Sequence, residues 1–158
     1  MTIDRNTLVF FDSSCLIAAA GSPSGGAGFL LSLCAKGYLK AALSQPVLLE
    51  AQRNIQAKLG HEAIKRFYDL LAVVPFSLAS LPEKAELKRL GKIINRKDVH
   101  VVAAALEVHA PFLLALDKGL VLEVNKVNLG IRALSPGEFI KTVLTNHVDY
   151  PSARDSGD

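Results

Sequence analysis

The sequence predicts an α/β domain with three layers, α/β/α, around a mostly parallel central sheet. Three observations lead to this prediction. Short apolar runs alternate with helical patterns along the chain, as in folds where helices cover both faces of a sheet. The run Leu8–Phe11 is fully apolar, which is typical of a strand buried on both faces. The length of 158 residues suffices for one domain with a real core and is too short for two ordinary ones.

The elements follow from apolar runs and from the residues that interrupt them. Ser44 is a good N-cap, and Pro46 is tolerated in the first turn that follows. Pro111 ends a nearly all-apolar helix. We expect strands at Leu8–Phe11, Tyr38–Leu43, Val73–Val74, Phe112–Leu116 and Ile131–Leu134. We expect helices at Cys15–Ala20, Phe29–Ala35, Ser44–Leu59, His61–Leu71, Leu81–Leu90, Val99–Val108 and Pro136–Leu144. Residues 1–144 then form the domain, and the polar segment 145–158 is expected to be a flexible tail.

Composition excludes several classes of protein. With 50% apolar and 21% charged residues, the chain is not disordered. Cys15 and Cys34 are its only cysteines, which excludes a disulfide scaffold and a zinc site built from CxxC pairs. The net charge of +3 permits a polyanionic partner without requiring one.

The chain is expected to be cytoplasmic and reduced. Its first apolar run is short and stops at Asp12, unlike a secretory signal. No uncharged stretch approaches the ~20 residues of a membrane-spanning helix. The richest candidate, 99–116, contains His100, Glu107, His109 and Pro111. We therefore expect no association with a membrane.

Four carboxylates are predicted to lie at one edge of the sheet. Asp12 and Asp117 follow strands, Asp98 precedes a helix, and Glu50 lies in the second turn of the helix that Ser44 opens. Right-handed crossovers bring strand ends and the following helix starts to the same edge. Carboxylates that share a crevice repel one another unless cations lie between them, and Mg²⁺ or Mn²⁺ takes such oxygen ligands. We expect the four within the span of a two-metal site, where ions lie ~3.5–4 Å apart.

Each of these carboxylates also has a structural interpretation. An aspartate just before a helix is more often an N-cap, so Asp12, Asp98 and Asp117 taken singly favour capping. Glu50 lies away from the apolar stripe of its helix, so by itself it reads as a solvated charge. The functional interpretation depends on the set.

Five segments, taken together, resemble the successive motifs of the PIN domain family. They are Val9-Phe-Phe-Asp-Ser-Ser-Cys-Leu-Ile17, Ser44-Gln-Pro-Val-Leu-Leu-Glu50, Asp98-Val-His-Val-Val-Ala-Ala-Ala-Leu106, Leu113-Leu-Ala-Leu-Asp-Lys-Gly-Leu120 and Leu134-Ser-Pro-Gly-Glu-Phe139. The resemblance covers about residues 7–144.

This resemblance implies a PIN-like fold and a nuclease dependent on Mg²⁺ or Mn²⁺. Such proteins are often RNA-cleaving toxins of toxin–antitoxin pairs, so it implies an RNA substrate and a cognate antitoxin, and by analogy a homodimer. The metal-holding and catalytic roles fall on Asp12, Glu50, Asp98 and Asp117. Ser13 matches the hydroxyl that usually follows the first acid. Two departures concern the water network or the rate: Ser14 replaces a common Asn, and Ala115 replaces a common Thr or Ser.

Basic residues flank the acidic set. Arg96 and Lys97 precede Asp98, and Lys118 follows Asp117, so they are candidates for contact with RNA phosphates. Taken singly, each of them is better explained as ordinary solvated charge, whereas for the group the two interpretations are even. Lys84, Lys88, Arg89 and Lys92 extend the basic character, which Glu83 and Glu86 dilute. With no Trp and three Tyr, the chain is poorly equipped to stack many bases.

Other candidate groups have weaker support. His100 and His109 could act as bases, but helix histidines are usually structural. The glycines at 25–28 lack the Gly-Lys-Ser/Thr ending of a phosphate-binding P-loop and indicate a flexible connection.

Two alternatives to a nuclease remain. A phosphotransfer domain of the haloacid-dehalogenase kind needs a second acid two residues after Asp12, where Ser14 stands, and a receiver domain needs paired acids near its first strand. A non-catalytic PIN-like module that binds RNA or a protein stays open.

Overall fold

The computed structural model describes residues 1–150 and 152, and its centre is a five-stranded sheet. All four strand pairings are parallel, in the order β3-β2-β1-β4-β5. The strands are β1 (Leu8–Phe11), β2 (Lys40–Leu43), β3 (Ser77–Leu78), β4 (Phe112–Leu114) and β5 (Arg132–Leu134). The helices are α1 (Ser13–Gly21), α2 (Gly26–Ala35), α3 (Gln45–Lys58), α4 (His61–Val73), α5 (Lys84–Leu90), α6 (Val99–Glu107), α7 (Lys118–Val127) and α8 (Pro136–Thr142), with 3-10 turns η1 (Arg96–Asp98) and η2 (Leu144–Asn146). The predicted α/β class and parallel sheet are confirmed.

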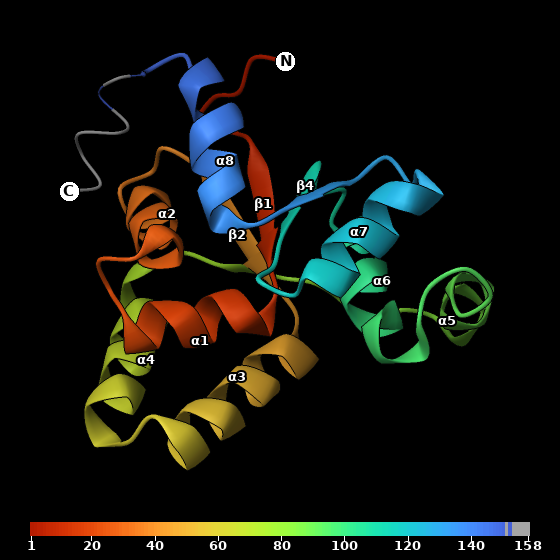
Figure 1. Ribbon diagram of the computed structural model, residues 1–158, viewed down its shortest axis with the longest axis horizontal. Helices are drawn as coiled ribbons and strands as arrows, with labels where there is room; N and C mark the ends of the chain where they lie inside the picture. Colours follow the sequence, from red (N-terminus) through yellow and green to blue (C-terminus); the bar gives the residue numbers. More distant parts are fainter. Residues whose placement is uncertain (151, 153–158) are drawn as a thin grey trace.

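Helices cover both faces of this sheet, as predicted (Figure 1). α2 packs against α8 on one face, and α5 packs against α6 on the other. α3 and α4 pack together and against α1, and they project beyond the edge at which β1 ends (Figure 1). This edge, where chain leaves the strands and enters α1, α3 and α7, is called the carboxyl edge below.

β1 lies at the centre because its side chains are apolar on both faces. Val9, Phe10 and Phe11 are completely buried, and Phe112 and Leu113 of the neighbouring β4 are nearly so. Burial of this kind stabilises a fold by ~25 cal/mol per Å² of apolar surface. The pairing of Phe11 with Leu114 brings both strand ends to the carboxyl edge.

Two differences from the predicted elements concern strands with little apolar character and an overlooked helix. The strand expected at Val73–Val74 is wrong: Val73 ends α4, and the edge strand is the exposed pair Ser77–Leu78. Lys118–Val127 had no predicted structure and forms α7, which begins at Asp117 and ends at Asn128 in the left-handed conformation. The glycine-rich connection is also shorter than expected, because Gly26 already begins α2.

The first residues of the expected tail are packed. His147 is buried and forms a parallel bridge with Ile3, and its Nε2 lies 2.7 Å from the carbonyl oxygen of Tyr38. The rest of the expected tail, 151 and 153–158, lies outside the described residues. Within the described residues no single helix is long and apolar enough to span a membrane, although α1 and α2, which meet at 98°, together reach that length and apolarity.

Candidate active site

Asp12 stands at the junction of β1 and α1 and caps the helix. Its Oδ2 accepts hydrogen bonds from the Ser14 backbone N–H at 3.4 Å and the Ser14 hydroxyl at 2.7 Å. Its own N–H donates to the Leu114 carbonyl at 2.9 Å, which joins the ends of β1 and β4. No hydrogen bond within the described residues engages Oδ1. The cap therefore occupies one carboxylate oxygen and leaves the second for another ligand.

Ser14 connects the first and last predicted acids. Its hydroxyl donates to Asp12 and accepts the Leu116 backbone N–H at 3.0 Å, so one oxygen ties the start of α1 to the loop before Asp117. Ser14, the residue that departs from the Asn common in the PIN motif, makes both of these hydrogen bonds. Ser13, which matches the hydroxyl that follows the first acid in the PIN motif, is buried in the same turn.

Asp117 caps α7 in a similar way. Its Oδ1 accepts the N–H groups of Gly119 at 2.9 Å and of Leu120 at 3.3 Å. Oδ2 has no hydrogen bond within the described part of the chain. The capping interpretation is correct for Asp12 and Asp117, and in each case it leaves one oxygen available.

Asp98 behaves differently. It is only 7% exposed, and its side chain makes no capping hydrogen bond to α6. Its pKa is raised from 3.8 to about 6, first by burial and then by the charge of Glu123, with smaller contributions from a hydrogen bond to Glu123 and from the charge of Asp117. The neighbouring Lys97 acts in the opposite direction. The Asp98 carboxyl is therefore buried and lies close to the carboxylates of Glu123 and Asp117.

Glu123 is the acid that sequence reasoning missed. It lies one and a half turns into α7, interacts with Asp98, and accepts a hydrogen bond from the Asn95 backbone N–H. It thereby links α7 to the turn η1 that carries Asp98. The signal was present in the sequence: Asp117 as N-cap and the spacing of Leu120, Val124 and Val127 indicate a helix, on which Glu123 lies close to its start.

Glu50 is the predicted acid with the least structural support. It lies in α3 beside the buried Ala51, and its backbone carbonyl accepts the Asn54 side-chain amide at 2.9 Å. Within the described residues its carboxylate makes no hydrogen bond or ion pair with any of the other acids. Its place in the site remains a prediction.

The carboxylates do not form a ready-made ligand set. In residues 1–150 and 152, no group of three or more His, Cys, Asp or Glu side chains is arranged to hold a metal ion, so the expected span of a two-metal site is not observed. The donor chemistry nevertheless suits a hard divalent cation. Asp12, Asp98, Asp117 and Glu123 offer only oxygen ligands. The pKa of Asp98 is raised first by its burial and then by nearby carboxylates, and a bound cation would favour its charged form.

The predicted basic residues lie around this group. Arg96 and Lys97 are exposed in η1, and Lys118 is exposed at the start of α7. Lys97 is close enough to Asp98 to affect its pKa.

Both free thiols are buried, and burial raises the pKa of Cys34 to about 12 and that of Cys15 further. They are small apolar core residues, as predicted.

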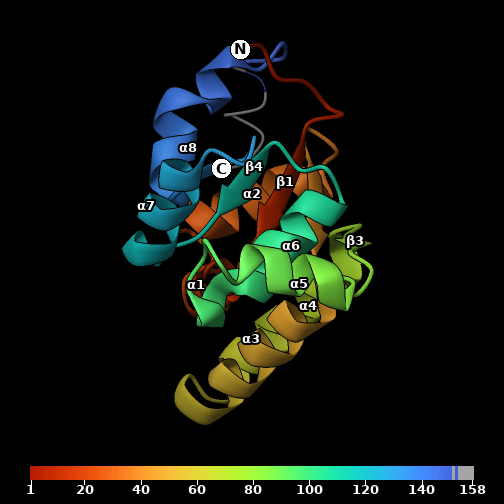
Figure 2. The ribbon, with the colours of Figure 1, turned by 90° about the vertical axis from the view of Figure 1, so that its right-hand side faces the viewer.

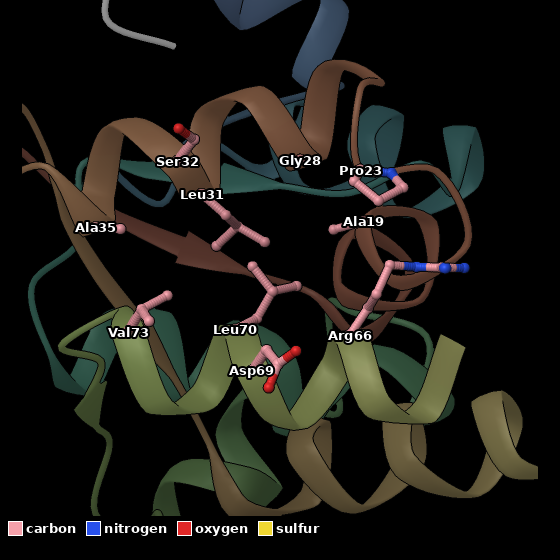
Figure 3. Close-up of a pocket in the computed structure, with 10 residues that line it drawn as sticks. All are labelled: Ala19, Pro23, Gly28, Leu31, Ser32, Ala35, Arg66, Asp69, Leu70 and Val73. Atoms are coloured by element: carbon pink, nitrogen blue, oxygen red, sulfur yellow. The ribbon is translucent and has the colours of Figure 1, made fainter. Parts of the chain in front are cut away.

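A separate apolar pocket lies away from the acids, between α1, α2 and α4 (Figure 3). Leu31 of α2 and Leu70 of α4 point toward each other across it (Figure 3). Arg66 at its margin donates from Nε to the Ala20 carbonyl at 2.6 Å. With a volume of about 340 Å³ it contains none of the predicted site residues, because it opens at the end of α1 opposite to Asp12.

Several solved structures have a similar fold. A chain of VapBC2 from Rickettsia felis, solved bound to a DNA fragment from their promoter, superposes with a TM-score of 0.57 at 19% identity over 82% of this chain and 98% of that one. The sarcin–ricin loop cleaving toxin VapC20 of Mycobacterium tuberculosis gives a TM-score of 0.52 at 16% identity, over 78% and 98% of the two chains. VapBC-1 from nontypeable Haemophilus influenzae gives 0.52 at 12% identity, over 83% and 99%.

Comparison by sequence gives no further relatives, since no family model and no curated protein matches. The structural likeness spans almost the full length of the three solved chains. It agrees with the motif order in the sequence and with the all-parallel sheet. The chain therefore has the fold of the PIN domain family.

Proposed function

We propose that this protein is an endoribonuclease that cleaves single-stranded RNA with Mg²⁺ or Mn²⁺, as the toxin of a toxin–antitoxin pair. The observation that carries the proposal is the place of Asp98 at the carboxyl edge, where burial first, then Glu123 and least of all Asp117 raise its pKa to about 6. A cation bound at this edge would offset the repulsion between these carboxylates, and perturbed carboxyl groups of this kind are typical of functional sites. The likeness to VapC20, a toxin that cleaves the sarcin–ricin loop, supports RNA as the substrate.

The side chains divide into two groups by their role. Asp12, Asp98 and Asp117 would hold the ion, with Glu123 and Glu50 at its margin. A bound Mg²⁺ or Mn²⁺ supplies an activated water and stabilises the leaving oxygen of a phosphodiester. Arg96, Lys97 and Lys118 would hold the RNA phosphates beside it, and Ser13 and Ser14 support the turn on which Asp12 lies. This assignment of residues, including the metal ligands, is part of the proposal.

The direct test is cleavage of a panel of single-stranded RNAs at low salt, with Mn²⁺ or with EDTA. We expect cleavage with Mn²⁺, none with EDTA, and loss in Asp98→Asn. Asp69→Asn is the matched control, because Asp69 is an exposed aspartate on α4 that lines the separate apolar pocket and none of the predicted site. Cleavage that persists in EDTA, or an intact protein that cuts none of the panel, would refute the proposal.

The basic residues have their own test. Replacing Arg96 and Lys97 together by Ala should weaken RNA binding and flatten its dependence on salt, because each phosphate contact with a single strand contributes about 0.7 to the slope. An unchanged slope would mean that both are ordinary solvated charges.

A second candidate is a non-catalytic module that binds RNA or a protein. The absence of a preformed metal group in the described residues favours it. RNA binding without cleavage under all metal conditions would identify this function.

The partners follow from the same proposal. We infer a cognate antitoxin, since two of the similar structures are VapBC complexes. We also propose a homodimer in the cytoplasm. Light scattering of the purified protein measures whether it is a homodimer. A small upstream reading frame with a DNA-binding motif would support the antitoxin.

A further inference from the structure

The short helix α5 separates charge between its two sides. On one side it forms a groove with α6 that is lined by Glu83, Glu86 and Glu107. On the other side lies a second groove, the basic groove, lined by Lys88, Lys92, Arg96 and His100 over an apolar base of Leu87 and Val99. α5 and α6 lie side by side in Figure 2, with η1 following α5 in the chain. This segregation is not visible in the sequence, where acids and bases alternate.

Among residues 1–150 and 152, no anionic side chain pairs with the cations of the basic groove. Its lining contains no carboxylate, and the ion pairs of the described residues involve none of Lys88, Lys92 or Arg96. Arg89, on the same helix, is paired with Glu86 at 2.6 Å and does not line the groove. Cations gathered without counterions create a positive field that attracts anions.

A buried polar atom lies beside these cations. Nδ1 of His100 is inaccessible to solvent and has no hydrogen-bond partner within the described residues. Buried polar atoms are usually satisfied, so an exception points to a missing partner. The groove has a volume of about 680 Å³, within the roughly 300–1,000 Å³ of sites that hold small molecules or nucleotide-sized groups.

The basic groove and the candidate active site share the turn η1. Arg96 lines it, and Asp98 is the last residue of the same 3-10 turn. We propose that the basic groove binds the phosphate backbone of the RNA strand just outside the position of cleavage, with Lys88 and Lys92 holding phosphates that the acids do not reach. This rests on the proposed ribonuclease function and adds to it a path for the strand, from the carboxyl edge along η1 to α5.

The test replaces Lys88 and Lys92 together by Ala and measures binding of a fluorescent single-stranded RNA in EDTA at several salt concentrations. Both side chains are exposed, so the fold should tolerate the change. Two lost phosphate contacts lower the slope by about 1.4, so that raising salt from 50 to 200 mM weakens binding about 7-fold less than in the wild type. The control, Lys36→Ala with Lys40→Ala, removes the same charge from the opposite edge of the sheet.

A charge-retaining variant and the nuclease assay separate the outcomes. Lys88→Arg with Lys92→Arg should restore the slope, because arginine also holds phosphate. An unchanged slope in the alanine variant, an equal change in the control, or a wild type that does not bind RNA would overturn the basic groove as a binding site. Wild-type protein that binds through the groove but does not cleave would refute the nuclease and leave the groove in place.

Discussion

At the residue scale, the three aspartates that precede helices, Asp12, Asp98 and Asp117, make different contacts. Asp12 and Asp117 satisfy backbone N–H groups of α1 and α7, whereas Asp98 caps nothing and interacts with other acids. Capping stabilises a helix by ~1 kcal/mol. A buried carboxylate beside two others, which Lys97 offsets only in part, has the opposite effect. Asp98, which has no capping role, is therefore the best candidate for a functional group.

The pKa of Asp98 predicts a dependence of stability on pH. Because the folded-state pKa is raised from 3.8 to about 6, the folded protein keeps a proton that the unfolded chain releases. This contribution is complete below the unfolded pKa and is lost as pH rises through the folded one. Since one pKa unit corresponds to ~1.4 kcal/mol and solvent screens part of the field, we expect a loss on the order of 1–2 kcal/mol. Urea unfolding at pH 4 and pH 7 in EDTA measures it. Asp98→Asn should remove this difference, and equal pH dependence in both proteins would contradict the assignment.

Glu123 should be a source of that raised pKa. Glu123→Gln keeps an oxygen that can accept the Asn95 N–H and removes the charge, so the pKa of Asp98 should fall toward its ordinary value. Carbon NMR of the Asp98 carboxyl during a pH titration measures this. Glu138→Gln, an exposed change on α8, is the control. If the Asp98 titration stays unchanged in Glu123→Gln, the two carboxyls do not interact.

At the scale of elements, prediction succeeded where burial is the dominant cause of structure. β1 was predicted with its exact bounds because all of its residues are apolar, and Ser44 was predicted as the cap of α3, where its Oγ accepts the Val47 N–H at 3.3 Å. β3 could not be predicted, because Ser77 and Leu78 are exposed and become a strand only by pairing with β2. α7 was overlooked although Asp117 and the spacing of its apolar residues indicate a helix, because its apolar stripe is narrow, with only Leu120 and Val124 buried. Glu123 was missed together with this helix.

The close packing of α2 against the connection that precedes it depends on a glycine. A Cβ on Gly28 would lie 2.2 Å from the carbonyl oxygen of Pro23, which is backbone and must shift. Gly28→Ala should therefore destabilise by ~1–3 kcal/mol, as overpacking does. Gly21→Ala is the matched control, since its Cβ would meet only a side-chain methyl of Leu59 at 3.4 Å. Thermal unfolding of the two variants compares them, and an equal melting temperature would show that the turn at Pro23 adapts.

At the scale of the whole molecule, strand order explains why residues far apart in sequence share one edge. β1 lies between β2 and β4, so the segments after all three strands leave at the carboxyl edge, with Asp12 in the middle. The sequence could predict this placement, because crossover handedness is general. It could not predict the distances between the side chains, which depend on helix packing. We expected Asp12, Glu50, Asp98 and Asp117 to converge. In the described residues, Asp98 instead interacts with Glu123 and Asp117, and no group of three ligands is arranged to hold a metal ion.

The central claim is that the carboxyl edge binds a divalent cation through Asp98. A thermal-shift titration of the wild type and Asp98→Asn with Mn²⁺ tests it most directly. A ligand that binds only the folded state raises the melting temperature with its concentration. We predict a rise in the wild type and a much smaller one in Asp98→Asn, whose metal-free form is as stable as the wild type or more stable, because repulsion is relieved. Equal shifts in the two proteins would show that Asp98 is not a ligand and would contradict the account.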